Sequence, residues 1–312
     1  MQFSTLQNWI KSTRLPASLL FSAVLCFLFF SCAVIPVQEQ LVSATRTNPL
    51  TRTNGNCAET AAVKQQPGAM QAGLSPDSIS IFNWNIYKEQ RQNWDVDLLR
   101  LSHEKDIILL QEAALNPELQ EVLQQKNLYW NLNSAFKYKG SDTGVLVAST
   151  IQDLESCGLR NSEPLIGLPK TILISRYNIT DSSDELLVAT IHGINISLGT
   201  GAYQEQLDSL QSILKNHDGP IILAGDFNNW SKKRTDIMVQ LAADLSLQIL
   251  SFAEESRTLF FGDPVDQILY RGLEPVSHIV HPVASSDHNP ISVTFRLTRS
   301  KTDHEPALTS IP

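Results

Sequence analysis

Several short apolar runs in this sequence, each typical of a buried β-strand, end in a carboxylate, an amide or an imidazole. A single Asn or Asp after a strand is usually a turn or cap residue. Six such endings in one stretch of chain are harder to explain as capping, and layered folds fix catalytic side chains at the ends of rigid strands. The positions are Asn85, Glu112, His192 with Asn195, Asp226 with Asn228, Asp266, and Asp287 with His288.

The segments around these positions resemble the endonuclease/exonuclease/phosphatase superfamily, which includes the DNase I-like and exonuclease III-like enzymes. They follow the family's order, cover essentially all of residues 79–297 and look closest to a bacterial branch. The resemblance implies a hydrolytic enzyme whose fold is a sandwich of two sheets with helices on both outer faces. The matching segments are FNWNIYK (82–88), LLQEA (109–113), TIHGINIS (190–197), LAGDFNNW (223–230), PVDQILYRG (264–272) and SSDHNP (285–290).

The proposed metal site follows from the charge of the substrate. A phosphodiester is anionic, so water or hydroxide attacks it poorly unless a cation held by hard oxygen ligands neutralises that charge. Asn85 with Glu112 is the best candidate ligand set for Mg²⁺ or Mn²⁺, and the resemblance implies the same. Asp287 is expected to complete the site from the opposite sheet. We therefore expect a divalent-metal-dependent phosphoesterase.

Two further pairs are expected to act on protons. Asp226 with Asn228 would orient the attacking water or handle the leaving-group proton. Asp266 would fix the tautomer of His288 and raise its basicity. The resemblance implies that this imidazole binds or deprotonates at the scissile phosphate.

His192 and Asn195 are expected to contact phosphate oxygens, with His192 a candidate general acid. Asn195 also fits a strand-end cap, and that alternative stays open. No spacing of Cys and His in the chain indicates a zinc site.

The apolar spacing predicts an α/β protein in which strands and helices interleave, although many strands follow one another directly. With the resemblance, this becomes a four-layer sandwich of two packed mixed β-sheets flanked by helices. Strands are expected near 79–85, 107–110, 144–149, 170–176, 186–192, 221–224, 266–270 and 291–297. Helices are expected near 95–103, 117–125, 203–215 and 235–245.

The chain divides into four parts by composition. Residues 1–38 have a basic start and then an uncharged, apolar stretch, which predicts a signal or membrane anchor. Residues 39–78 predict a polar linker, 79–297 the catalytic domain and 298–312 a polar tail. We expect a location in the cell envelope, anchored or exported, with the N-terminal segment in contact with membrane; a cytoplasmic protein is the alternative.

Cys57 and Cys157 are the two cysteines outside the N-terminal segment. An oxidising compartment would permit them to pair. Two buried free thiols fit the sequence equally well, because it gives no distance between them.

The charge balance bears on the substrate. The chain has 32 acidic and 24 basic side chains, a net charge of −8, which argues against a generic electrostatic nucleic-acid binder. An enzyme that binds its own cation is still compatible, and cleavage of nucleic-acid phosphodiesters by a monomer is the leading expectation. The alternatives are an esterase for phospholipid or inositol-phosphate head groups, and a non-catalytic envelope binding protein. The basic triplet 232–234 would either hold phosphates or begin a solvated helix.

Overall fold

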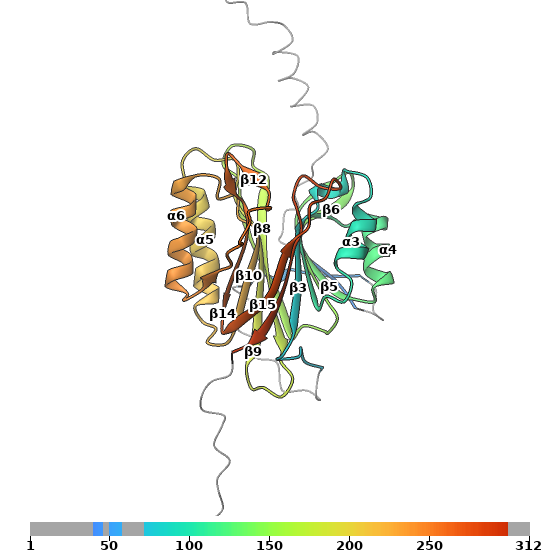
Figure 1. Cartoon of the computed structure of the whole chain (residues 1–312). Helices are drawn as coiled ribbons and strands as arrows, with labels where there is room; N and C mark the ends of the chain where they lie inside the picture. The colour runs from blue at the N-terminus through green and yellow to red at the C-terminus, as the bar shows by residue number, and fades with distance from the viewer. Residues whose placement is uncertain (1–39, 46–49, 58–71, 299–312) are drawn as a thin grey trace, which may run out of the picture.

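The computed structural model describes residues 40–45, 50–57 and 72–298. In this part of the chain two β-sheets pack face to face, and helices cover the outer face of each sheet (Figure 1). Both sheets are mixed, because β3 with β4 and β9 with β10 are parallel pairs among antiparallel ones. The predicted α/β four-layer sandwich is confirmed.

The first sheet has eight strands. Their spatial order is β15 (Leu273–Val280), β16 (Ile291–Leu297), β3 (Ile79–Asn85), β4 (Ile107–Ala114), β6 (Ser141–Ser149), β5 (Tyr129–Tyr138), β1 (Gln40–Ala44) and β2 (Thr51–Thr53). Helices α3 (Trp94–Leu101) and α4 (Pro117–Gln125) lie on its outer side in Figure 1, and the short turn η2 (Tyr87–Glu89) follows β3.

The second sheet has six strands. Their order is β11 (Gln248–Ile249), β14 (Asp266–Arg271), β10 (Ile221–Asp226), β9 (Glu185–His192), β8 (Pro169–Asn178) and β7 (Glu155–Ser162). Helices α5 (Gly201–Leu214) and α6 (Lys232–Asp244) cover its outer face, and a separate hairpin is formed by β12 (Leu259–Phe260) and β13 (Asp263–Pro264).

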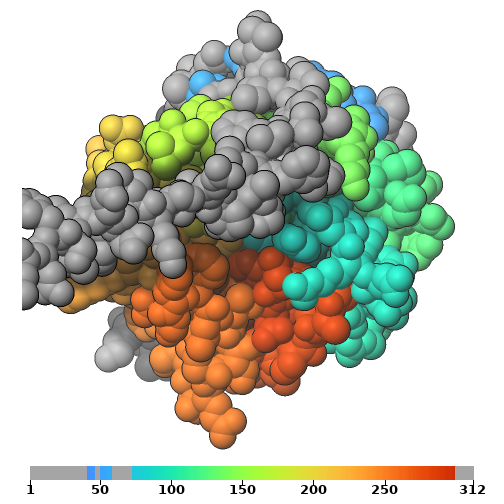
Figure 2. Space-filling model, turned by 90° about the horizontal axis from the view of Figure 1, so that it is seen from above, coloured from blue at the N-terminus to red at the C-terminus, as the bar shows by residue number. Residues whose placement is uncertain are grey.

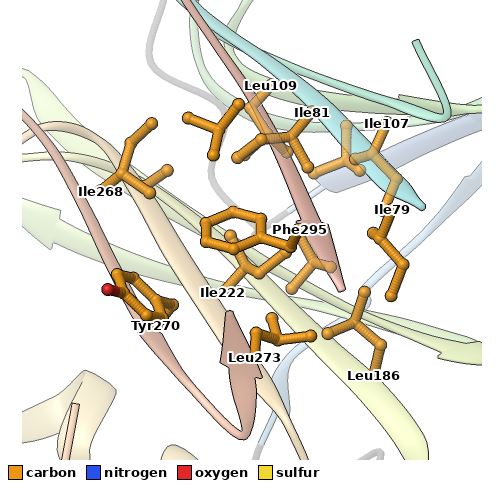
Figure 3. Packing of buried hydrophobic residues seen from close by; sticks show 14 of the residues in the cluster. Ile79, Ile81, Ile107, Leu109, Leu186, Ile222, Ile268, Tyr270, Leu273 and Phe295 are labelled. Carbon is orange, nitrogen blue, oxygen red and sulfur yellow. The ribbon is translucent and has the colours of Figure 1, made fainter. Parts of the chain in front are cut away.

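Alternation of side chains along the strands divides the core into layers. In β3, Ile79 and Ile81 face the interior between the sheets, whereas Phe82 and Trp84 pack in the layer shared with α3 and α4. Figure 3 shows the inner layer, where Ile79 and Ile81 lie with side chains of both sheets. Both faces of β3 are buried, and its polar residues Ser80, Asn83 and Asn85 are buried along with its apolar ones.

The predicted polar linker is wrong for part of its length. Residues 40–44 form β1, which pairs with β5, and residues 51–53 form β2, which pairs with β1. The sequence pattern missed them because β1 is short, although Leu41 and Val42 are buried. By adding to β5, β1 satisfies backbone groups that an edge strand would leave unpaired. The folded domain therefore begins before Ile79.

The strands 129–138, 155–162 and 273–280 were also absent from the predicted layout. Their polar and apolar residues do not alternate regularly; β15, for example, has six consecutive residues that are at least partly exposed. The expected signal or anchor (1–38) lies outside the described residues. Within the described part of the chain, no helix is long and apolar enough to span a bilayer.

Cys57 and Cys157 form a disulfide with a Cα–Cα distance of 4.8 Å. Sequence alone left this pairing open, and the bond joins the segment after β2 to β7. The tertiary structure brings the two cysteines together because Asn56 also forms a β-bridge to Gly158.

Candidate active site

A row of three polar side chains lies at neighbouring strand ends of the second sheet. Asp226, the last residue of β10, is paired in register with His192 of β9 on one side and with Asp266 of β14 on the other. Gly225 makes the close approach possible, since a Cβ there would lie 2.1 Å from the Ile191 carbonyl oxygen. Residues far apart in the sequence are thus aligned by the hydrogen-bonding register.

The first sheet contributes from the facing side. Asn85 ends β3, and Glu112 lies on a β-bulge of β4, where the register shifts between Leu110 and Ala113. Glu112 has a φ of 54°, which turns this residue out of the regular strand. The bulge explains why an acidic side chain can follow a buried apolar strand and still point to the site.

His288 belongs to the loop before β16, and the first sheet holds this loop in place. The indole nitrogen of Trp84 donates to the His288 carbonyl oxygen at 2.9 Å, and the Ser286 hydroxyl donates to the Asn85 carbonyl at 2.7 Å. Arg91 donates to the Ser286 carbonyl, so the segment after β3 (teal) and the loop before β16 (red) lie side by side in Figure 2. Trp84 is a packing residue, 1% exposed.

We call Asp226, Asp266 and His288 the carboxylate side of the site. Asp226 is 3% exposed and accepts hydrogen bonds from the Asn85 amide (3.1 Å) and from the Asn228 amide (3.2 Å) and backbone N–H (3.0 Å). His288 Nδ1 lies 2.8 Å from Asp266 Oδ2, and its Nε2 lies 4.0 Å from Asp226 Oδ2. The expected pairs of Asp226 with Asn228 and of Asp266 with His288 are both in contact.

The charges on this side are set by burial and by neighbours. Burial alone would lower the pKa of His288, but the carboxylate of Asp266, with those of Asp226 and Asp287, raises that pKa to about 10. Burial raises the pKa of Asp226 above its usual range, and the adjacent Asp266 adds to this rise. His288 is therefore an imidazolium at neutral pH.

We call Lys88, Glu112, Lys170 and His192 the lysine side. Lys88 Nζ forms an ion pair with Glu112 Oε2, and Lys170 Nζ lies 2.6 Å from His192 Nε2. His192 Nε2 is 3.6 Å from both Glu112 Oε1 and Asp226 Oδ2. This imidazole therefore links the two sides.

On the lysine side the pKa values of Glu112 and His192 are both lowered, whereas those of Asp226 and His288 on the carboxylate side are both raised. Burial by itself would raise the pKa of Glu112, but the nearby positive groups, Lys88 first among them, together outweigh it and lower that pKa to about 2. Burial, and then the charge of Lys170, hold the pKa of His192 well below its usual range. At neutral pH, Glu112 is ionised and His192 is neutral.

The donor set fits a hard divalent cation. Ionised Glu112 and the amide oxygen of Asn85 could both serve as oxygen ligands, and Mg²⁺ needs only one or two carboxylates beside water. Within the described residues, no three His, Cys, Asp or Glu side chains are grouped so that they could hold a metal by themselves. Asp287 is exposed, and its side chain accepts from the Ser286 hydroxyl at 3.4 Å. It lies on the loop before β16, a strand of the same sheet as β3 and β4, so the expected approach from the opposite sheet is wrong.

Asn195 lies further along the loop after β9. Its side-chain oxygen accepts from the Trp230 indole at 2.9 Å, and its backbone N–H donates to Glu163 at 2.6 Å. It lines the same cavity as Glu112 and His192. Asn195 is thus held beside the site and is not a cap of its own strand.

The basic triplet 232–234 does not form a cluster of free cations. Lys232 pairs with Asp236 on the helix surface, whereas Arg234 is 1% exposed. The Arg234 guanidinium donates to the carbonyls of Asn228 (3.0 Å) and Asn195 (2.9 Å) and also to that of Ile194. Arg234 therefore holds together the two loops that carry Asn195 and Asn228.

Two lysines of the site were not among the predicted residues. Lys88 belongs to the matched segment FNWNIYK, so its place in that segment was a usable signal. Lys170 stands at the start of a predicted strand without any local pattern to mark it. Only the pairing of β8 with β9 reveals that it meets His192.

The fold and this arrangement of strand-end residues are typical of the layered α/β class of phosphoesterases. A family comparison agrees: the profile described as "Endonuclease/Exonuclease/phosphatase family" matches residues 82–288, and the chain belongs to this family. The family comprises phosphoesterases that include nucleases and phosphatases.

Among proteins similar in sequence is a "UPF0294 protein" of Vibrio campbellii, 36% identical over 286 residues, which are 91% of this chain and 98% of that protein. Another UPF0294 protein, from Photorhabdus laumondii, is 39% identical over 219 residues, 70% of this chain and 84% of that one.

Solved structures share the fold at low sequence identity. The human Nocturnin catalytic domain with bound sulfate has a TM-score of 0.58 at 18% identity, over 73% of this chain and 96% of that one. A mannosyl-6-phosphatase of Bacteroides thetaiotaomicron has a TM-score of 0.54 at 18% identity, over 70% of this chain and 99% of that one.

Proposed function

We propose that the chain is a divalent-metal-dependent phosphoesterase and that nucleic-acid phosphodiesters are its leading candidate substrates. The observation that carries this proposal is the aligned row His192, Asp226 and Asp266, faced by Glu112 and His288 from the other sheet. This set brings three groups within a few ångströms of one another. Glu112 is an anion that could bind a metal cation, His288 is a cation that could bind phosphate, and Asp226 is a carboxylate that could transfer a proton.

Asn85 and Glu112 would hold Mg²⁺ or Mn²⁺, and Asp287 is the third candidate ligand, from the loop before β16. The cation would neutralise negative charge on the phosphate oxygens. Glu112 stays ionised at any pH near neutral, as a metal ligand must.

Asp226 is the group that orients the attacking water and accepts its proton. Its carboxylate is fixed by two amides, Asn85 and Asn228, so that few of its orientations remain. Its raised pKa makes it a better base than an exposed aspartate would be. A proton acceptor held in place is what attack on a phosphorus atom requires.

His288 supplies positive charge to the phosphate. Asp266 holds the ring by Nδ1, so Nε2 faces Asp226 and the space where the ester would bind. His192 is neutral beside Lys170, so it would accept a proton or a hydrogen bond from the bound phosphate ester and would carry no permanent charge. Asn195 would contact a phosphate oxygen from the loop after β9.

The choice of substrate has less support. Because Arg234 is buried, only two of the three cations of the basic triplet 232–234 could bind the phosphates of a polynucleotide. Hydrolysis of phospholipid or inositol-phosphate head groups therefore stays the alternative, and the monomeric state stays a prediction.

The test is an activity screen of the full chain with Mg²⁺ or Mn²⁺ on plasmid DNA, RNA, phospholipids and inositol phosphates. The full chain is used because β1 and β2 precede Ile79. Asp226→Ala and His288→Ala should abolish a turnover that EDTA also stops, whereas the exposed Asp236→Ala should not. Full activity in both site variants would refute the assignment, and turnover of phospholipid without nucleic acid would replace the leading substrate.

We further propose that the protein resides in the cell envelope, with its N-terminal segment in the membrane. The Cys57–Cys157 disulfide supports this, because such bonds persist in oxidising compartments. A reporter fused after Leu297 that is active only outside the cytoplasm is the expected result. Cytoplasmic reporter activity would favour the alternative location.

A further inference from the structure

Exposed apolar side chains gather at the end of the sandwich that carries the active site. Eleven large apolar side chains are exposed in the described part of the chain, and six of them lie in three connections at this end. These connections join β7 to β8, β9 to α5, and β12 to β13 just before Asp266 of β14. We call the six side chains the apolar rim: Leu165, Ile196, Leu198, Leu259, Phe260 and Phe261.

Hydrogen bonds and a ring contact hold the three connections together. The Glu163 carboxylate accepts from the backbone N–H groups of Asn195 (2.6 Å) and Ile196 (2.9 Å), so the β7–β8 connection is fixed to the loop after β9. The Trp230 indole donates to the Asn195 side chain at 2.9 Å, and its ring centroid lies 5.5 Å from that of Phe261 in the hairpin. The apolar rim is therefore one surface and not three scattered positions.

The β12–β13 hairpin is the most apolar part of the rim. Leu259, Phe260 and Phe261 are consecutive, and they are 50%, 46% and 80% exposed. Phe261 and Gly262 have φ values of 52° and 94° and form the turn, so the tip of the hairpin is aromatic. A turn in water usually carries polar residues, and a run of exposed apolar ones marks an interaction site. The hairpin lies at the upper end of the sandwich in Figure 1.

The chain enters the folded domain at this same end. Gln40, the first residue of β1, is paired in register with Ser134 of β5. The row continues through Gly144 of β6 to Ala113 of β4, directly after Glu112 of the active site. Three strand spacings, roughly 14 Å, separate Gln40 from this part of β4. Because β1 runs from this row toward the opposite end, the residues before Gln40 approach from the active-site end.

The sequence before Gln40 indicates what faces the apolar rim. The uncharged stretch 15–38, which predicts a signal or membrane anchor, is separated from Gln40 by Glu39 alone. Two residue steps span at most about 7 Å. A bilayer that holds this stretch is therefore close to the active-site end of the domain. A second copy of the chain would cover the rim equally well, but would not explain why the rim and the entry of the chain share one end.

We propose that the apolar rim binds the surface of a lipid bilayer, with Phe260 and Phe261 inserted at the headgroup–acyl boundary and the active site facing the membrane. Aromatic side chains are favoured at this boundary. The proposal rests on the proposed membrane location of the N-terminal segment, and it does not depend on which phosphate ester is cleaved. A tether alone leaves the domain free to rotate, whereas the tether and the rim together fix its orientation.

The test measures the depth of the hairpin tip in the full chain, reconstituted in vesicles of phosphatidylethanolamine and phosphatidylglycerol. Phe261→Cys carries a nitroxide label, in a chain whose Cys26 and Cys32 are replaced by serine. Electron paramagnetic resonance reports depth from the accessibility of the label to oxygen and to a nickel chelate. The label should lie about 5–10 Å into the interface, the depth usual for interfacial segments.

The control label is Ser183→Cys, on the exposed turn between β8 and β9 at the opposite end of the sandwich. This label should remain in water. If position 261 is as accessible to the nickel chelate as position 183, in vesicles that carry the chain, the proposal is overturned.

A label on a second connection shows whether the hairpin orients the domain. Leu198→Cys, at a position that is 84% exposed, should also be shielded from the nickel chelate. Phe260→Ser with Phe261→Ser should return this label to water. The matched control is Val239→Ser with Val276→Ser, which removes side chains that are 46% and 51% exposed on other elements and should leave the label shielded. Shielding that survives the loss of both phenylalanines would contradict the role of the hairpin.

Two further outcomes separate the alternatives. Dipolar broadening between labels at position 261, lost when unlabelled chain is added, would identify a second copy as the occupant and would overturn the proposal. A shielded position 261 together with cytoplasmic activity of the reporter after Leu297 would refute the proposed envelope location alone. An exported, membrane-bound chain whose position 261 lies in water would refute only the role of the apolar rim.

Discussion

The two sides of the site use the same residue types in opposite charge states. On the carboxylate side, His288 lies between two aspartates, and its pKa is raised to about 10. On the lysine side, His192 lies against Lys170, and its pKa is held well below the usual range. One imidazole is thus a cation and the other is neutral, although their Nε2 atoms are 4.0 Å and 3.6 Å from the same Asp226 oxygen.

The carboxylates differ in the same way. Glu112 beside Lys88 has a pKa lowered to about 2, whereas burial and the neighbouring Asp266 raise that of Asp226. In this site, neighbouring charges and burial, and not the residue type, decide which side chains can transfer a proton and which carry a fixed charge. Three variants, each altering one side, test this division, and a fourth alters a residue outside both sides.

The largest effect is expected from Asp266→Asn on the carboxylate side. The amide keeps the shape but removes the nearest of the charges that raise the pKa of His288, so this pKa should fall and the imidazolium should be less stable near neutral pH. Turnover of the substrate found in the screen should fall about 10²- to 10⁴-fold. The exposed Asp236→Asn serves as the control, and a His288 pKa unchanged by NMR titration would refute the pairing.

A smaller effect is expected from Glu112→Gln on the lysine side. The variant removes the anionic ligand and leaves Lys88 unpaired, so Mn²⁺ should bind at least about tenfold more weakly. Calorimetric titration with Mn²⁺ measures this, with the exposed Glu118→Gln as the matched control. Unchanged Mn²⁺ affinity would mean that the metal binds elsewhere.

Lys170→Met tests the cause of the neutral histidine. Burial is the larger cause and remains, so the pKa of His192 should rise only part of the way toward its usual value. NMR titration of the metal-free protein reports this pKa directly, and Lys233→Met on the exposed start of α6 should not change it. A pKa of His192 that stays fixed in Lys170→Met would assign the whole effect to burial.

The smallest effect is expected from Lys232→Ala. Its side chain is 87% exposed and pairs with Asp236, an arrangement that contributes about 0.3–0.5 kcal/mol. Activity and melting temperature should both stay within error of the parent chain. A fall in nucleic-acid cleavage, greater at low salt, would restore the basic triplet as a phosphate-binding element.

Much of the fold followed from local patterns. The segments that became β3, α4 and β10 were expected close to their observed bounds, because their apolar spacing and capping residues are local features. Asn116 shows this well, since its side chain accepts from Leu119 N at the start of α4. Strand β1 could not be predicted in this way, because its stability depends on pairing with β5, nearly ninety residues later.

The sequence alone identified the family and the strand-end residues, because residue type and order carry that information without coordinates. It also placed Asp266 beside His288, which lie 2.8 Å apart. Only the tertiary structure decided the charge states, the roles of Lys88, Lys170 and Arg234, the disulfide and the apolar rim. Each depends on distance and burial between segments that are remote in the chain, and Coulombic and desolvation energies are functions of those quantities.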